Sequence, residues 1–391
     1  MGLKEFKIHF DNPYAAYTSG QTVTGRVVVV IDSPKKIRGI KLVIKGGADT
    51  HFTTSQRQHR NHEGNDVIES NTLTGHEEYF EASFYLIGST SGREMILGPG
   101  IHTYTFTYSL PYNLPSSFES DFGCVRYTAK AVIDRPWKFD QESKVAFTVV
   151  SNFDLNLHQN ALLPLNLEAN KNFGCLCCAS PPLSVNISLP VRGYVPGQTI
   201  PIRVNVENES GKRINTVKLT LQKVVTYSAT TPRADTKVVE LKVAEVSKGP
   251  VEGRQTVSYE QDLDVPPLPP SNLQNGRIID FEYKLKVEAC VEGAFSCNLR
   301  KSTTIYIGTV PLSSYQISQP PAPGIQPPLP QPSAPYKVNV GPTSNQYQDH
   351  APPSYAEATF GGSRTLRDRN ESEYVIGAGQ RFLPKYPVYQ F

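Results

Sequence analysis

Several features of other protein classes are absent from this chain, and each absence narrows what it can be. The formal net charge is only +3 over 391 residues, which gives no reason to expect binding to nucleic acid. The apolar runs, such as Val27 to Ile31, are far shorter than the ~20 residues of a membrane-spanning helix. The amino terminus carries no apolar signal region. We therefore expect a cytoplasmic protein with at most peripheral membrane association.

Cysteine is also scarce, with six in the chain, and three of these crowd together as Cys175, Cys177 and Cys178. A secreted disulfide framework is usually spread more evenly, so we expect free thiols. The crowded group has several interpretations: structural thiols, a palmitoylation site, part of a zinc site, or a redox-linked sensor. Its spacing is not the usual two-residue gap of zinc ligands.

No catalytic motif is present. The chain has no Gly-x-Ser-x-Gly elbow, no phosphate-binding loop and no His-Glu-x-x-His pair. Histidines gather at His51, His59, His62 and His76, but without the tight spacing and carboxylates of a metal site. We expect them in a solvated loop, and we expect a protein that is not an enzyme and needs no cofactor or metal.

One sequence pattern occurs twice in the chain. Tyr17 and the run Gly20-Gln21-Thr22-Val23 return as Tyr194 and Gly197-Gln198-Thr199-Ile200, and the similarity continues without a gap through the following strand. A spacing this long is not a solenoid repeat, which runs about 20–50 residues. The repeat therefore indicates a duplicated domain.

Within each copy the apolar residues alternate with polar ones. Between His102 and Leu110, for example, aromatic and leucine side chains alternate with Thr103, Thr105 and Thr107. This period of two is typical of strands buried on one face, and glycine- and proline-rich turns separate them. We count about seven strands per copy, which predicts an all-β protein of two tandem antiparallel β-sandwiches.

The domain boundaries follow from these patterns. We expect a first sandwich at 1–150, a connector at 151–180, a second sandwich at 181–309 and a tail at 310–391. The tail is rich in proline and has no periodicity at its start, which predicts disorder. The polar stretch 48–74 predicts a long exposed loop or hairpin, and the single tryptophan, Trp137, is expected to plug the end of the first sandwich.

The tail contains a Pro-Pro-x-Tyr motif, formed by Pro352, Pro353 and Tyr355. Two prolines hold a polyproline II turn that packs into an aromatic groove, and the tyrosine enters the adjacent pocket. WW domains offer such a surface. A weaker second WW site is predicted at Leu383, Pro384 and Tyr386.

Another tail motif is Pro332-Ser333-Ala334-Pro335. It is the type of peptide that the ESCRT-I complex binds through its ubiquitin-variant domain. This motif supports an alternative function, namely a scaffold for vesicle budding and trafficking.

The chain resembles the arrestin-domain-containing proteins, or α-arrestins, from about Glu5 to Gly308. The resemblance rests on the block from Tyr17 to Gly25, on Arg126 to Trp137 and on Arg192 to Ile200. It implies two arrestin-type sandwiches and an adaptor that binds transmembrane cargo, such as receptors or transporters. It also implies recruitment of WW-domain ubiquitin ligases of the HECT type, so that cargo is ubiquitinated, internalised and sorted at the plasma membrane and endosomes. Family members commonly carry two Pro-Pro-x-Tyr motifs, whereas this chain has one complete copy.

A basic run in the first copy allows two interpretations. Five cations stand close together, at Lys35, Lys36, Arg38, Lys41 and Lys45. They predict either a solvated outer face of a strand or a site for phosphorylated tails or anionic lipid.

Overall fold

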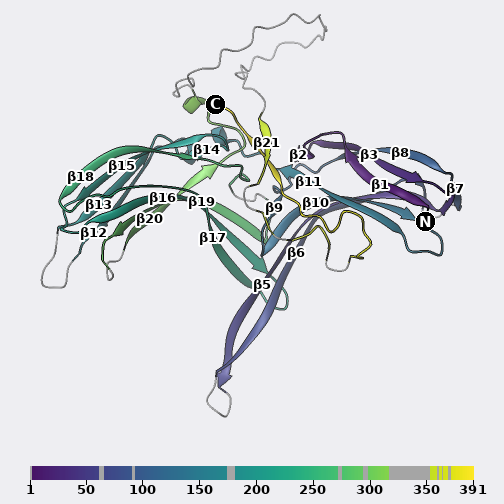
Figure 1. Cartoon of the computed structure of the whole chain (residues 1–391), viewed down its shortest axis with the longest axis horizontal. Coiled ribbons are helices and arrows are strands. Elements are labelled where there is room, and N and C mark those ends of the chain that lie inside the picture. Colours follow the sequence, from purple (N-terminus) through teal and green to yellow (C-terminus); the bar gives the residue numbers. More distant parts are fainter. Residues whose placement is uncertain are drawn as a thin grey trace, which may run out of the picture.

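The computed structural model describes most of the chain. The described residues are 2–60, 66–89, 93–173, 181–271, 275–293, 298–316, 353–358, 361–362, 364–368 and 371–391, without the side chains of 55–60 and 66–69. Strands dominate them, and they form two β-sandwiches that lie side by side along the long axis (Figure 1). No helix among these residues has the length and apolar character to cross a membrane.

The first sandwich pairs a three-stranded sheet, in the order β1-β3-β8, with a larger sheet, in the order β2-β11-β10-β5-β6. The short β9 pairs with β10, and β4 pairs with β7 as a separate small sheet. Its strands are β1 (Leu3–Phe10), β2 (Ala16–Thr18), β3 (Thr22–Ile31), β4 (Lys35–Ile37), β5 (Gly39–Arg60), β6 (Asp66–Gly88), β7 (Met95–Leu97), β8 (Gly100–Ser109), β9 (Phe118–Glu119), β10 (Gly123–Asp134) and β11 (Gln141–Val150).

The second sandwich pairs a sheet in the order β12-β13-β15-β18 with one in the order β14-β20-β19-β16-β17. A short helical passage, η1 (Leu155–Leu157) and α1 (Gln159–Leu162), leads into it, and α2 (Ser313–Gln316) follows it. Its strands are β12 (Leu165–Lys171), β13 (Leu183–Leu189), β14 (Gly193–Tyr194), β15 (Thr199–Asn208), β16 (Ile214–Ala229), β17 (Asp235–Lys248), β18 (Gln255–Asp264), β19 (Ile279–Val291) and β20 (Leu299–Ile307).

The two sandwiches share a strand order, as the repeated sequence predicts, except that the second has β12 as an additional edge strand. In each, a short strand runs parallel to the last long strand: β2 beside β11 and β14 beside β20. The repeated Gly-Gln pair makes the same turn twice, with Gly20 at φ 82° and Gly197 at φ 95°. Glycine tolerates this left-handed region without strain. The prediction of two tandem sandwiches is therefore confirmed.

The alternating residues form the core. Phe6, Ile8 and Phe106 are buried in the first sandwich, and the apolar residues of β19 are buried in the second. Tyr127 and Tyr283 occupy equivalent buried positions, and each hydroxyl donates to a proline carbonyl, Pro115 O at 2.6 Å and Pro269 O at 2.9 Å. Such bonds satisfy a polar group that burial would otherwise penalise.

Of the two structures expected for the polar stretch 48–74, the hairpin is confirmed, because β5 and β6 pair along their length and project from the sandwich (Figure 1). Two other expectations need adjustment. The connector contains β12, which pairs with β13 and so belongs to the second sandwich. The expected plug is wrong: Trp137 is 99% exposed, because the chain turns at the end of β10 and Trp137 adopts φ 61° there.

Contacts join the two sandwiches. Tyr227 donates to Ser120 Oγ at 2.9 Å, and Arg277 pairs with Glu77 at 2.9 Å. Phe118 and Phe281 pack with ring centroids 5.3 Å apart, and the amino group of Lys223 lies 4.8 Å from the Phe118 ring centroid. The two sandwiches are therefore joined by polar, aromatic and cation–π contacts.

Candidate functional site

The described parts of the tail have defined structure, which the sequence does not lead us to expect. β21 (Ser354–Glu357) and β22 (Lys385–Val388) pair as a two-stranded antiparallel sheet. This small sheet lies where the two sandwiches meet (Figure 1). The expected disorder of 310–391 thus does not extend to these stretches. Residues 317–352, which include the proline-rich part, lie outside the described residues.

Tyr355 of the Pro-Pro-x-Tyr motif lies in β21, opposite Pro387 of β22. Its ring is half-buried and tilts against the ring of Tyr14, with centroids 5.7 Å apart. Burial raises the pKa of Tyr355. Its hydroxyl makes no hydrogen bond with another described residue. The motif tyrosine is therefore held through its strand pairing and through the ring contact with Tyr14.

Tyr386, from the predicted second WW site, is placed very differently. It is 1% exposed, it packs against Val150 and Ala358, and its hydroxyl donates to Ser117 O at 2.7 Å. Burial raises the pKa of Tyr386 well above its usual value. Pro384 is buried as well, whereas Leu383 is partly exposed. In this arrangement Tyr386 is an anchor of the tail and is closed to a WW domain, so its use as a second WW site stays a prediction that requires β22 to detach.

The end of the tail reaches the second sandwich. Tyr389 donates its backbone N–H to Pro196 O at 3.0 Å and its hydroxyl to Thr309 O at 2.7 Å. A Cβ at Gly197 would collide with the backbone of Tyr389, so the turn glycine also makes room for the tail. The tail therefore bridges both sandwiches.

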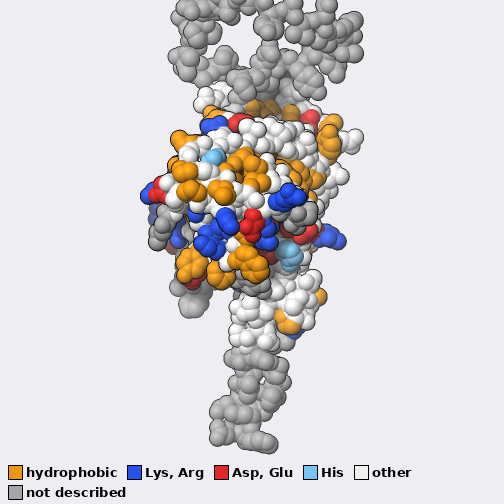
Figure 2. Space-filling view, turned by 90° about the vertical axis from the view of Figure 1, so that its right-hand side faces the viewer, with side chains coloured by type: hydrophobic (Ala, Val, Ile, Leu, Met, Phe, Trp, Pro, Cys, Tyr) orange, Lys and Arg blue, Asp and Glu red, His pale blue; other side chains and the backbone are white. Residues whose placement is uncertain are grey.

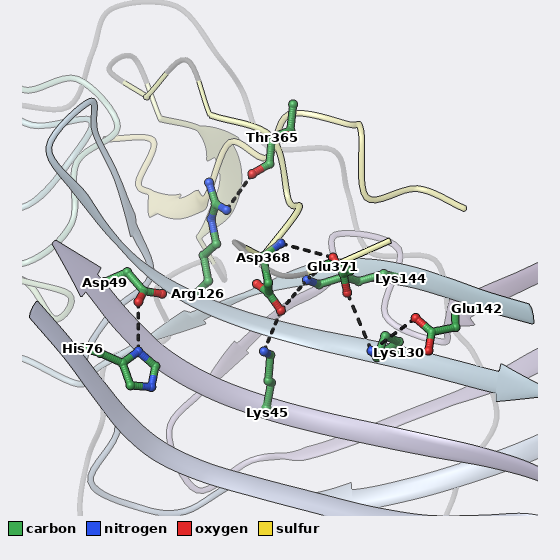
Figure 3. Close-up of polar contacts among 10 residues, drawn as sticks. All are labelled: Lys45, Asp49, His76, Arg126, Lys130, Glu142, Lys144, Thr365, Asp368 and Glu371. Atoms are coloured by element: carbon green, nitrogen blue, oxygen red, sulfur yellow. Dashed lines mark hydrogen bonds and ion pairs between the residues drawn. The ribbon is translucent and has the colours of Figure 1, made fainter. Parts of the chain in front are cut away.

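Between β21 and β22, the tail covers the outer face of the first sandwich and makes a network of ion pairs there (Figure 3). Asp368 lies 2.7 Å from Lys45 Nζ and 3.0 Å from Lys144 Nζ. Glu371 lies 3.0 Å from Lys144 Nζ and 3.7 Å from Lys130 Nζ. The side chains of Lys144 and Glu371 are only 1% and 5% exposed. The strands β5, β10 and β11 thus supply three lysines to two tail carboxylates.

The charges in this network are stabilised by one another. Burial acts to raise the pKa of Asp368, but the hydrogen bonds and ion pairs with Lys45 and Lys144 outweigh it and hold that pKa below its ordinary value. Burial likewise opposes the charge on Lys45, and the bond to Asp368 raises its pKa nevertheless. Asp368 N–H also donates to Glu371 at 3.2 Å, which fixes the two carboxylates relative to each other.

Two backbone contacts flank the network. Arg126 donates to Thr365 O at 2.7 Å, while a bond of 2.7 Å ties the same guanidinium to the buried Glu119. Further along, Ile376 pairs with the edge of β11, accepting from Lys144 N–H at 2.8 Å and donating to Glu142 O at 2.9 Å. A pocket of about 1400 Å³ remains between this tail segment and the sheet.

The basic run of the first copy is mostly paired with acids. Lys36 lies 3.7 Å from Glu94, Arg38 lies 2.6 Å from Asp134, and Lys45 belongs to the network above. At this end of the molecule, Lys and Arg side chains stand among exposed hydrophobic ones (Figure 2). The interpretation of this run as a solvated outer face therefore does not hold for Lys45, which pairs with Asp368 of the tail.

The acidic side of this network was not predicted from the sequence. A signal for it exists: after Pro353 charged residues return, with Arg364, Arg367, Asp368 and Glu371 close together. That change in composition distinguishes the end of the tail from its proline-rich beginning.

Other predicted residues lie outside the described part of the chain. They are Pro352 of the first motif, Pro332, Ser333, Ala334 and Pro335, and Cys175, Cys177 and Cys178. Their predicted roles stay predictions. Of the cysteines that are described, Cys124 is buried and Cys290 is half-buried, and both are free. Among the described residues, no group of three or more His, Cys, Asp or Glu side chains is placed to hold a metal ion.

Comparison with known proteins finds a matching domain family for each of the two sandwiches. Residues 6–156 match the arrestin (or S-antigen) N-terminal domain, and residues 179–312 match the arrestin (or S-antigen) C-terminal domain. Arrestin domain-containing protein 17 of Caenorhabditis elegans is 32% identical over 81% of this chain and 72% of its own length. Mouse arrestin domain-containing protein 4 is 29% identical over 78% of this chain and 71% of its own length. Human arrestin domain-containing protein 1 is 27% identical over 84% of this chain and 71% of its own length.

Proposed function

The chain belongs to the family of arrestin-domain-containing proteins, the α-arrestins, and on that premise we propose that it is an adaptor between membrane-protein cargo and WW-domain ubiquitin ligases of the HECT type. Membership of this family supports an adaptor-type role, and arrestin-family proteins are generally not enzymes. In the proposal the two sandwiches hold the cargo and the tail brings the ligase. Ubiquitinated cargo is then internalised from the plasma membrane and sorted at endosomes.

The observation that supports the ligase half is the state of Tyr355. Tyr355 lies in the strand β21, directly after Pro353, so its backbone is already in the broad extended region that also contains the polyproline II form of WW ligands. The tyrosine ring contacts the exposed Tyr14 and is not sealed into the core. The ring therefore lies near the surface, and the groups that a WW domain has to displace to reach it are Tyr14 and the paired strand β22.

The ligase half is tested by a binding measurement on the full chain. We expect Tyr355→Ala to weaken binding of a purified WW domain at least about tenfold, because the pocket that receives the tyrosine would be left empty. Tyr374→Ala is the matched control, since Tyr374 is 91% exposed in the same tail and lies outside the motif. Measurable binding that is equally strong for the Tyr355 variant and the parent would sink the proposal.

The consequence for cargo is tested in cells. A cargo protein captured by proximity labelling with the parent chain is expected to lose ubiquitin when Tyr355 is replaced, while remaining associated with the chain. If the variant lost cargo association as well as cargo ubiquitination, Tyr355 would take part in cargo binding. That result would contradict the proposal that the sandwiches bind the cargo and the tail binds the ligase.

A further inference from the structure

Access to Tyr355 depends on β22. β21 and β22 pair from Ser354 opposite Val388 to Glu357 opposite Lys385, and Ala358 N–H donates to Pro384 O at 2.7 Å. A WW domain receives the prolines of its ligand in an aromatic groove and the tyrosine in an adjacent pocket. Tyr14 covers the ring of Tyr355, and β22 holds the same stretch as a paired strand, so the motif cannot enter that groove while both contacts are in place.

The position of β22 in turn depends on how the tail is fixed to the first sandwich. One contact is the buried Tyr386, supported by the bond of 3.0 Å from Lys385 N–H to Thr148. The others lie upstream, where Asp368 and Glu371 meet the lysines and Ile376 joins β11. The tail between Thr365 and Val388 is thus fastened at several successive points.

The lysine face is built to receive carboxylates. The side chain of Lys144 is 1% exposed, and its ion-pair partners among the described residues, Asp368 and Glu371, both come from the tail. A buried ammonium group without an acid beside it is strongly unfavourable. Lys45 and Lys130 add positive charge on either side of it. The face therefore has the character of a binding site for an acidic peptide.

We propose that the outer face of β5, β10 and β11 is an acidic-peptide site, that its ligand is the chain's own segment around Asp368 and Glu371, and that its occupancy closes the Pro-Pro-x-Tyr motif to WW domains. The inference rests on the proposed function, because it concerns access to the ligase-binding motif. When the segment leaves the lysines, β22 loses its upstream support and Tyr355 is uncovered. The apparent affinity for a WW domain then equals the intrinsic affinity multiplied by the open fraction.

The test compares one purified WW domain binding to four partners. They are the full chain, the variant Asp368→Asn/Glu371→Gln, the control Asp262→Asn/Glu373→Gln and a synthetic peptide of residues 346–391. The control removes the same two charges from exposed carboxylates that make no ion pair with a described residue. Thermal unfolding of each variant checks that the sandwiches are intact.

We expect the peptide to bind most tightly and the parent chain at least about tenfold more weakly. The Asp368/Glu371 variant should approach the peptide, and the control should match the parent. Hydrogen exchange at Ala358 should be faster in the Asp368/Glu371 variant, since its amide bonds to Pro384. Adding Tyr355→Ala to that variant should abolish the gain.

The outcomes separate this inference from the proposed function. If the peptide does not bind the WW domain, the proposed function fails. If the peptide and the parent chain bind equally, or the Asp368/Glu371 variant binds no better than the control, the motif is not closed by this site and the inference is overturned while the adaptor proposal stands.

Discussion

The two sandwiches have the same frame but different outer faces. Their strand orders correspond, and Tyr127 and Tyr283 make the same buried bond. Strand pairing around these tyrosines aligns the four cations that contact the tail, Lys45, Arg126, Lys130 and Lys144, with Gln222, Glu282, Lys286 and Ser302. Only one of the four positions keeps its charge in the second copy. Duplication has preserved the core, whereas the cationic face that receives the acidic segment of the tail belongs to the first copy.

The sharpest way to test this difference is to remove the central lysine. We expect Lys144→Met to abolish docking of the tail, because breaking a buried ion pair costs about 3–5 kcal/mol. Hydrogen exchange at Ile376, whose amide bonds to Glu142, measures the loss. Ser302→Met, at the aligned exposed position of β20, should change stability by less than about 0.5 kcal/mol. If hydrogen exchange at Ile376 became equally fast in both variants, docking of the tail would not depend on the face of the first sandwich in particular.

The copies also differ at a buried position, where Gly46 of the first aligns with Lys223 of the second. A Cβ at Gly46 would lie 2.5 Å from the ring of Tyr127, so no side chain fits there. Lys223 is 2% exposed, its amino group lies over the rings of Phe118 and Phe281, and burial lowers its pKa to about 8. We expect Lys223→Met to raise the free energy of unfolding at pH 7 by about 1–3 kcal/mol, since replacing a buried charge by an apolar chain is often stabilising.

The sign of the pH dependence follows from that lowered pKa. Between the folded value of about 8 and the ordinary value of 10.5, the unfolded chain binds more protons at this position than the folded chain does. The contribution of Lys223 to stability therefore rises with pH across this window. Urea unfolding at several pH values should show the advantage of Lys223→Met shrinking from pH 8 to pH 10.5. A constant difference would mean that Lys223 is not buried as a charged group.

The shared frame itself is tested by the paired tyrosines. Tyr127→Phe and Tyr283→Phe each leave a buried proline carbonyl without its donor, which costs about 1–3 kcal/mol. We expect the two losses to agree to within about 0.5 kcal/mol, because the two environments correspond. Denaturant unfolding measures both. A large loss in one variant and none in the other would break the equivalence of the cores.

The smallest effect is expected at Trp137. Its side chain is 99% exposed, so Trp137→Ala removes no packing and should change stability by less than about 0.5 kcal/mol. Thermal unfolding of this variant beside Phe147→Ala, which removes a fully buried ring of the same sandwich, makes the contrast direct. A loss of stability in the Trp137 variant as large as that in the Phe147 variant would show that Trp137 packs against the end of the sandwich, as the sequence predicts.

What the sequence predicted well is whatever depends on local periodicity. Alternation and the repeated Gly-Gln turn are enough to predict two sandwiches, because the side-chain period and the positive φ are properties of short segments. Leu165, Leu167 and Ala169 alternate in the same way, yet they stand in a stretch that reads as a connector, so β12 was missed.

What the sequence could not predict depends on pairing between distant residues. Asp368 and Lys45 are 323 positions apart, and nothing in either neighbourhood identifies the other. The burial of Tyr386 has the same origin, since its partner Ser117 lies 269 positions away. A short motif can be recognised from its letters, but whether it is open or closed is decided by the surface on which it comes to lie.

The exposed turn between β10 and β11, which carries Trp137, has a practical consequence. Trp137 is the single tryptophan of the chain, and its side chain is 99% exposed, while that of the nearby residue Phe139 in the same turn is 95% exposed. Its fluorescence should already resemble that of an unfolded chain in the native state, so melting of the sandwiches will leave the emission colour almost unchanged. A blue shift on adding any binding partner would instead report, without an attached dye, that this one corner has been covered.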